Sequence, residues 1–323
     1  MVKTYLFTSH GVREDVGLDD RQSLAEDECR LLWIDVRSAS ADEVHDLARR
    51  FGLHPVTVRS CLDRYHRPHL YEFADYFYVN LTVVRRSKRL DHGLKASELH
   101  VFAGSDFIIT ISPEEQAEAV DKALAIYRDG PAVCARGPMY AVYLLTEDLV
   151  ESYFPIVESL DDEADKLENS MLEKADKKCL RKLFALKRRG FELRKLLGPQ
   201  RDILTELARR DFPFIKGENR VYFQDVYNRM IRIFDMMDTI REILSGNLDI
   251  YLSNVSNRLN EVMKVLTVVA TVLMTLSFIT GFYGMNFKHL PWLDSPNAFR
   301  NTCLFMAALT AAMLWWFKQK GWL

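Results

Sequence analysis

The sequence predicts an α+β membrane protein, in which a cytosolic α/β domain and a long helical hairpin precede one very long helix and a second membrane span. Two observations support this prediction. Residues 221–282 contain no proline and only one glycine, Gly246, before Gly281, so they are expected to form one helix of roughly 90 Å. Residues 265–287 contain no charged side chain, and a stretch of this length can cross a hydrocarbon core of about 30 Å.

The composition sets few limits on function. A net charge of −2 over 323 residues gives no sign of nucleic-acid binding. The five cysteines are scattered, without the paired spacing of a zinc site or a disulfide framework. No P-loop, GxSxG, HExxH or Rossmann glycine pattern occurs. The sequence therefore predicts neither an enzyme nor an organic cofactor.

Charged residues at the ends of the apolar segments predict the orientation in the membrane. The chain starts without an apolar leader segment, so we expect the residues before Val265 to stay in the cytosol. Arg258 and Lys264 precede the first span, and Lys318 and Lys320 follow the second. Because basic flanks mark the cytosolic side, we expect a multi-pass protein of the plasma (inner) membrane with both termini in the cytosol.

Residues 1–135 have the pattern of the α/β domain. Short runs of β-branched and aromatic residues predict strands at residues 2–7, 31–36, 76–84, 99–103 and 107–111. A helix is predicted over residues 40–51, with Ser40 as its N-cap and Gly52 as its stop. His54-Pro55 predicts the start of another helix.

Residues 136–220 have the pattern of a helical hairpin whose arms carry opposite charge. The first arm, residues 139–173, is rich in acids, and the second arm, residues 174–210, is basic over its first half. Opposite charges favour the pairing of such arms, although each exposed pair contributes little. Gly198-Pro199 predicts a kink or break in the second arm.

One face of the long helix is small, polar or acidic from the soluble part into the predicted span. Steps of three or four residues connect Asp235, Asp238, Glu242, Gly246, Asp249, Ser253, Ser256, Asn260, Met263, Thr267, Ala270, Met274, Ser277, Gly281 and Gly284. Packing against another membrane helix is one explanation. The acids before Asn260 favour the other, a water-filled path that attracts cations. A neighbouring apolar stripe is expected to pack on the hairpin arms and on neighbouring copies: Val226, Met230, Ile233, Met237, Ile240, Leu244 and Tyr251.

The polar face ends in Tyr283-Gly284-Met285-Asn286-Phe287, and a second apolar segment follows at residues 299–317. This combination resembles the CorA family of magnesium channels, whose signature YGMNF precedes a short external loop and a second span. The resemblance assigns residues 221–287 to the long helix, the first span and the motif, 288–298 to the external loop, 299–317 to the second span and 318–323 to a basic cytosolic tail. It implies a homopentamer in the lipid bilayer, with the first spans inside and the second spans outside.

The polar face and the motif together predict an ion pathway. Gly284, Met285 and Asn286 form the expected selectivity filter, because amide and backbone oxygens can hold hydrated Mg²⁺ through its water molecules. The expected pore-lining residues are Asp249, Ser253, Asn260, Met263, Leu266, Thr267, Ala270, Met274, Ser277 and Gly281. Met263, Leu266 and Met274 would form apolar constrictions, with plain helix packing as the alternative.

Gating in this family is associated with divalent ions bound between adjacent cytosolic domains. Asp225 matches the carboxylate that the long helix contributes to that site. The region expected to supply its partner reads Arg85-Arg86-Ser87-Lys88-Arg89, and these cations would repel a divalent ion. A regulatory metal at Asp225 and a salt bridge from Asp225 to one of these arginines across subunits both stay open.

We therefore expect a homo-oligomeric channel for divalent cations, with Mg²⁺ as the transported ion and as a candidate regulatory ion. Permeation by Co²⁺ or Ni²⁺, a Zn²⁺ transporter of the same superfamily, and a membrane-anchored cytosolic sensor or scaffold are the alternatives. Met285 favours magnesium, because the zinc branch typically differs at this position. Lys288 and His289 would lower the local cation concentration at the outer mouth.

Overall fold

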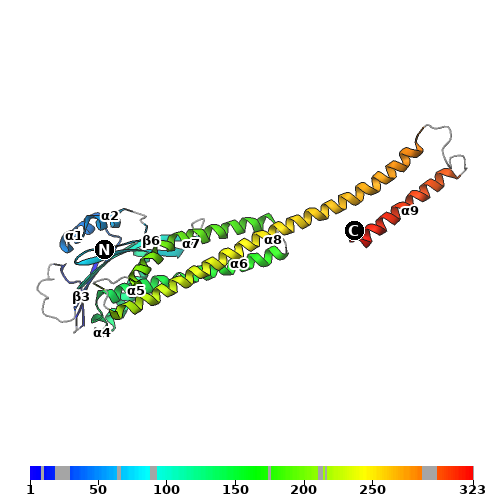
Figure 1. The fold of residues 1–323 in the computed structure, drawn as a ribbon. Helices are drawn as coiled ribbons and strands as arrows, with labels where there is room; N and C mark the ends of the chain where they lie inside the picture. Colours follow the sequence, from blue (N-terminus) through cyan, green and yellow to red (C-terminus); the bar gives the residue numbers. More distant parts are fainter. Residues whose placement is uncertain are drawn as a thin grey trace. The chain divides into compact units, whose positions relative to one another are not determined.

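The computed structural model describes most of the chain and confirms the α+β class (Figure 1). The described residues are 1–8, 11–18, 30–63, 67–87, 93–173, 176–209, 214, 217–285 and 297–322. They form two compact units: Met1–Ser170 with Arg181–Gly246, and Met171–Leu180 with Asn247–Leu323.

The first unit contains a seven-stranded sheet in the order β2-β1-β3-β7-β6-β5-β4. Its strands are β1 (Val2–Thr8), β2 (Gly11–Glu14), β3 (Arg30–Arg37), β4 (His69–Glu72), β5 (Tyr76–Arg86), β6 (Leu94–Gly104) and β7 (Phe107–Ser112). β3 and β7 pair in parallel, and the other neighbouring pairs are antiparallel. The five predicted strands are confirmed. The sequence missed β2 and β4, which lie at the two edges and are too short for a clear alternating pattern.

Helices α1 (Ala41–Phe51) and α2 (Pro55–Leu62) pack on one face of the sheet and bury Val44, Leu47 and Val58 in a core shared with β3 and β7. The predicted caps are confirmed. Ser40 and Glu43 form a reciprocal capping box, and Gly52 ends α1 with a left-handed φ of 65°. The His54 ring accepts a hydrogen bond from the backbone of Val56 at the start of α2.

The opposite side of β3 contacts a helix that the sequence did not predict, α3 (Glu118–Arg128), which follows the short 3₁₀ helix η2 (Glu114–Gln116). The ring of Tyr127 in α3 meets Trp33 and Phe7 edge-on, with centroids 5.6 and 5.4 Å apart. Two further helices follow, α4 (Pro131–Cys134) and α5 (Pro138–Glu151).

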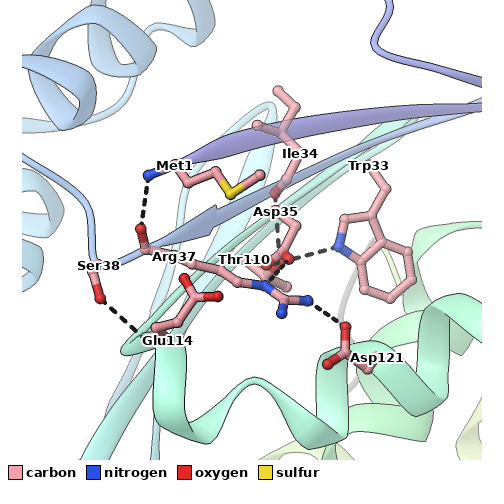
Figure 2. A network of polar contacts seen from close by, with 9 residues as sticks. All are labelled: Met1, Trp33, Ile34, Asp35, Arg37, Ser38, Thr110, Glu114 and Asp121. Atoms are coloured by element: carbon pink, nitrogen blue, oxygen red, sulfur yellow. Dashed lines mark hydrogen bonds and ion pairs between the residues drawn. The ribbon is translucent and has the colours of Figure 1, made fainter.

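An ion-pair network that starts from the buried Asp35 connects the middle of the sheet to α3 (Figure 2). The carboxylate of Asp35, which is fully buried, lies 2.8 Å from Nε of Arg37 and accepts a 3.0 Å hydrogen bond from Thr110. Arg37 also binds Asp121 of α3. Burial raises the pKa of Asp35, and the hydrogen bond from Arg37 and its charge act in the opposite direction. Arg37 therefore offsets part of the cost of placing a carboxylate inside the sheet.

The acidic arm of the predicted hairpin is two helices, α5 and α6 (Phe154–Glu173), so the prediction of one helix over residues 139–173 was wrong. Pro155 cannot donate to the carbonyl of Glu151, which ends α5 there. The buried Tyr153 between the helices donates to the carbonyl of Thr82 and accepts a 2.7 Å hydrogen bond from Gln200. The break therefore positions a tertiary contact.

The basic arm is one helix, α7 (Lys177–Arg209), with Pro199 inside it. Of the predicted kink or break, the break is wrong, because packing on both sides of the proline holds the helix together: Leu197, Gln200, Ile203 and Leu204 are buried. The expected attraction between the arms is confirmed by an ion pair between Glu163 and Arg189, with Oε1 and Nη1 2.9 Å apart.

The long helix is α8 (Gly217–Tyr283), and the second apolar segment is α9 (Ala298–Gln319). Both are long and apolar enough to cross a membrane. The expected apolar stripe is confirmed in the first unit, where Val226, Met230, Ile233, Met237, Ile240 and Leu244 are buried. Tyr251 is half-buried in the second unit.

Candidate functional site

The predicted pore-lining residues lie on α8 within the second unit, and all of them are exposed in the single chain. They are Asp249, Ser253, Asn260, Met263, Leu266, Thr267, Ala270, Met274, Ser277 and Gly281. The side chain of Met274 is 73% exposed and that of Leu266 is 60% exposed. An apolar side chain left this open is available to lipid or to another protein surface.

The roughly opposite side of the same helix segment is partly covered. Val268 is buried, and Val272, Thr275, Ile279 and Tyr283 follow it at steps of three or four residues as half-buried positions. The second unit, which also contains α9, therefore leaves the predicted pore face open while it partly covers the other side.

The threonine hydroxyl groups of the span donate hydrogen bonds within the helix itself. Thr267 donates to the carbonyl of Met263 at 2.7 Å, Thr271 to Thr267 at 2.7 Å and Thr275 to Thr271 at 2.8 Å. Such bonds allow a hydroxyl group to lie in an apolar environment without a partner on another helix.

The polar face ends where α8 ends, at the motif. The amide of Gly284 still donates to the carbonyl of Thr280 at 2.9 Å, and that of Met285 donates to Phe282 at 3.4 Å. A Cβ atom at position 284 would lie 3.1 Å from the carbonyl oxygen of Thr280, so glycine fits this tight helix end. The terminal carbonyls carry the negative end of the helix dipole, which places partial negative charge next to Gly284 and Met285. The third predicted filter residue, Asn286, and most of the predicted loop at 288–298 lie outside the described residues.

Asp238, expected on the free polar face, instead forms an ion pair with Arg194 of α7. The acidic face is therefore not open along its whole length. In the first unit part of it is used to hold α7 on α8.

Asp225 lies in the first unit and is paired within its own chain. Its carboxylate is 2.9 Å from Nε of Arg229, one helical turn further on, and Arg229 also contacts Glu151 at 3.2 Å and Glu147 at 3.4 Å. Burial acts to lower the pKa of Arg229, but the surrounding carboxylates outweigh it and the pKa is raised. The four-residue spacing of Asp225 and Arg229 could have predicted this pair, whereas the contacts from α5 need the tertiary fold.

The basic stretch that begins at the end of β5 is also paired within the chain at Arg85 and Arg86. Arg85 binds Glu118 of α3 at 2.8 Å, and Arg86 binds Ser159 and lies 3.7 Å from Glu163 of α6. Lys88 and Arg89 lie outside the described residues. Across the described ranges, no three histidine, cysteine, aspartate or glutamate side chains are placed to hold a metal ion in one chain.

Comparison with known proteins agrees with this arrangement. The family described as "CorA-like Mg2+ transporter protein" matches residues 28–319. The chain is 35% identical over 293 residues to the cobalt/magnesium transport protein CorA of Thermotoga maritima, covering 90% of this chain and 83% of that protein. It is 24% identical over 222 residues to a zinc transport protein ZntB of Pectobacterium carotovorum, covering 68% of this chain and 66% of that protein.

Solved structures show the same fold along the whole chain. The complete structure of the CorA magnesium transporter from Methanocaldococcus jannaschii matches with a TM-score of 0.82 and 25% identity, covering 100% of this chain and 99% of that chain. The full-length CmaX protein matches with a TM-score of 0.72 and 24% identity, covering 98% and 96% of the two chains. The motif, the two spans and the match over residues 28–319 lead to one conclusion: this chain belongs to the CorA family of Mg²⁺ transporters.

Proposed function

We propose that copies of this chain assemble around the polar face of α8 into a channel that admits hydrated divalent cations, with Mg²⁺ as its main cargo. The observation that carries this proposal is the two-sidedness of the span. The polar face from Asp249 to Gly281 is open, while the side around Val268 is partly covered, with Val268 buried and the positions that follow it half-buried. Packing of a second span alone does not require a face that continues from acidic residues through small polar residues to the motif.

A single helix cannot enclose a path, so each copy must present the same face to a common axis. Closed cyclic symmetry meets this requirement, and the family resemblance makes five the number of copies. In this assembly the first spans line the axis and the second spans face lipid. The basic flanks at Arg258, Lys264, Lys318 and Lys320 support a plasma-membrane orientation with both termini in the cytosol.

The motif would hold the ion through its water shell. Mg²⁺ gives up its waters reluctantly, so oxygen atoms that accept hydrogen bonds from these waters suit it better than direct ligands. The Asn286 amide and the Gly284 carbonyl would provide them, next to the negative end of α8. Further along the axis, rings of Met263, Leu266 and Met274 would form constrictions that close by expelling water.

This function is tested by uptake into liposomes that contain the purified full-length chain, with Mg²⁺, Zn²⁺, Co²⁺ and Ni²⁺ compared side by side. We expect Mg²⁺ uptake above that of protein-free liposomes. Preference for Zn²⁺ would move the chain to the zinc branch of the superfamily. No uptake of any of the four ions by an intact oligomer would support the anchored sensor or scaffold instead.

Asp225 is the proposed regulatory position, because it lies on α8 where the family supplies a carboxylate. In the single chain this carboxylate forms an ion pair with Arg229. We expect Asp225→Ala to shift the Mg²⁺ concentration at which channel current is inhibited. Glu151→Ala is the matched control, since it also removes a carboxylate from Arg229 and should leave the dose response unchanged. Identical curves for Asp225→Ala and the parent would remove the regulatory role.

A further inference from the structure

One face of α7 is both basic and aromatic, and it is exposed to solvent. Arg181, Phe184, Arg188, Phe191 and Lys195 follow each other at alternating steps of three and four residues, and each is exposed. We call these five residues the basic ridge. The side chains of Phe184 and Phe191 are 56% and 67% exposed. The opposite side of α7 holds the buried Leu183, Leu186, Leu193 and Leu197, so the ridge is not needed to pack α7 in its own chain.

A face of complementary charge runs along α6. Glu158, Asp162, Asp165 and Asn169 are exposed at the same alternating spacing, opposite the buried Val157, Leu160, Ala164 and Leu167. We call these four residues the acidic ridge. Among the described residues, none of its three carboxylates lies in an ion pair, and neither do Arg181 and Lys195 of the basic ridge. Within the described residues, the charges of the two ridges without an ion-pair partner are therefore those of Glu158, Asp162, Asp165, Arg181 and Lys195.

We infer that the occupant of the basic ridge is the acidic ridge of a second copy of this chain. Two exposed phenylalanines, one heptad apart and flanked by cations, have the spacing of a helix-pairing seam. Pairing of two basic ridges would place like charges together, whereas pairing of a basic ridge with an acidic ridge places opposite charges together. An interface between two different surfaces closes into a ring when repeated by rotation. The inference therefore rests on the proposed oligomeric channel and supplies a contact for it.

The ion pair between the arms fixes the register of this contact. Glu163 of α6 is level with Arg189 of α7 in one chain. The inference takes the rotation axis as parallel to α6 and α7, so that rotation changes no residue's height and the same levels meet between neighbouring copies. Asp165, two residues further along α6, is then level with Lys187 and Arg188. Glu158, five residues earlier, is level with Arg194 and Lys195. Both carboxylates meet a residue of the basic ridge.

The test is a disulfide cross-link between two differently tagged full-length chains that are co-expressed. One chain carries Asp165→Cys and the other Arg188→Cys, in a background where Cys29, Cys179 and Cys303 are serine. We expect a product that contains both tags. The control pairs Asp165→Cys with Lys182→Cys, because Lys182 is exposed on a different side of α7, and it should give little product.

A charge swap provides the second readout. Glu158→Lys alone and Lys195→Glu alone should each lower the fraction of intact oligomer in native mass spectrometry, and the double variant should restore it. Equal cross-linking of the test and control pairs in an intact, Mg²⁺-transporting oligomer would overturn the ridge contact and leave the proposed function standing. A specific cross-link without uptake of any divalent ion would support the ridge contact and overturn the proposed function. Protection of the Arg188→Cys thiol by anionic vesicles, with no cross-link, would assign the ridge to a lipid surface and overturn the inference.

Discussion

Replacing Asn286 by alanine is expected to lower the rate of Mg²⁺ uptake into liposomes by about tenfold or more, while the oligomer still assembles. The substitution removes from each copy the amide oxygen that we propose accepts hydrogen bonds from the ion's water shell. A tenfold loss corresponds to about 1.4 kcal/mol in the barrier for ion passage. The measurement is the initial rate of uptake at saturating Mg²⁺, together with native mass spectrometry of the same preparation.

Asn301→Ala is the matched control, because it makes the same chemical change on an exposed position of α9 and should leave uptake unchanged. Asn286→Asp tests the reason for an amide at this position. A ring of carboxylates would hold a divalent ion more tightly and release it more slowly, so uptake should saturate at lower Mg²⁺ and reach a lower maximum. Normal uptake by Asn286→Ala would contradict the role of this residue in the filter.

Replacing Arg37 by methionine is expected to give the largest loss of stability in the soluble part of the chain. Asp35 would lose the cation 2.8 Å from its carboxylate while staying fully buried. Breaking a buried pair in this way typically costs about 3–5 kcal/mol, which would lower Tm by roughly 10 °C in a domain of this size. The measurement is thermal unfolding of the purified protein in detergent.

Two comparisons make this result specific to the buried charge. Asp35→Asn combined with Arg37→Met should recover most of the loss, because no charge is then left without a partner. Arg85→Met, which removes an exposed pair with Glu118, should cost less than about 1 kcal/mol. Equal losses in the single and double variants would contradict the assignment to Asp35.

The loss in Arg37→Met should also depend on pH. Burial already raises the pKa of Asp35, and loss of Arg37 raises it further. A raised folded-state pKa means that stability is fully present below the unfolded-state pKa and is lost as pH rises through the folded-state pKa. The destabilisation should therefore be smaller in mildly acidic buffer than at neutral pH. A loss that is the same at both pH values would show that Asp35 does not carry the charge.

The features that the sequence predicted correctly depend on signals within a few residues. Ser40 and Gly52 are cap residues with their own local geometry, and the buried apolar stripe from Val226 to Leu244 follows from helical spacing. The missed break at Tyr153 has a different origin. Its hydroxyl group reaches Thr82 and Gln200, which are far away in sequence, and only Pro155 gave a local sign of it.

Tertiary packing also explains why α7 does not break at Pro199 and why Asp238 is paired. A proline inside a helix costs about 3 kcal/mol, but α7 is held on both sides of Pro199 by buried residues, and Gln200 also accepts a hydrogen bond from the backbone of Thr82 at 2.8 Å. Asp238 lies on the polar face by its helical spacing, but its carboxylate forms an ion pair with Arg194. Helical periodicity predicts on which side of a helix a residue lies. It cannot show which charges on that side form ion pairs with a neighbouring helix.

The threonine hydroxyl groups of the span have a mechanical consequence. Thr267, Thr271 and Thr275 each donate to the carbonyl one turn earlier, so none of these three bonds links α8 to another element. A small rotation of this segment about its own axis would then break none of these hydrogen bonds and would change only which apolar surfaces touch. The energetic resistance to such a rotation would come from side-chain packing. Adding or removing a single methyl group would therefore change this resistance.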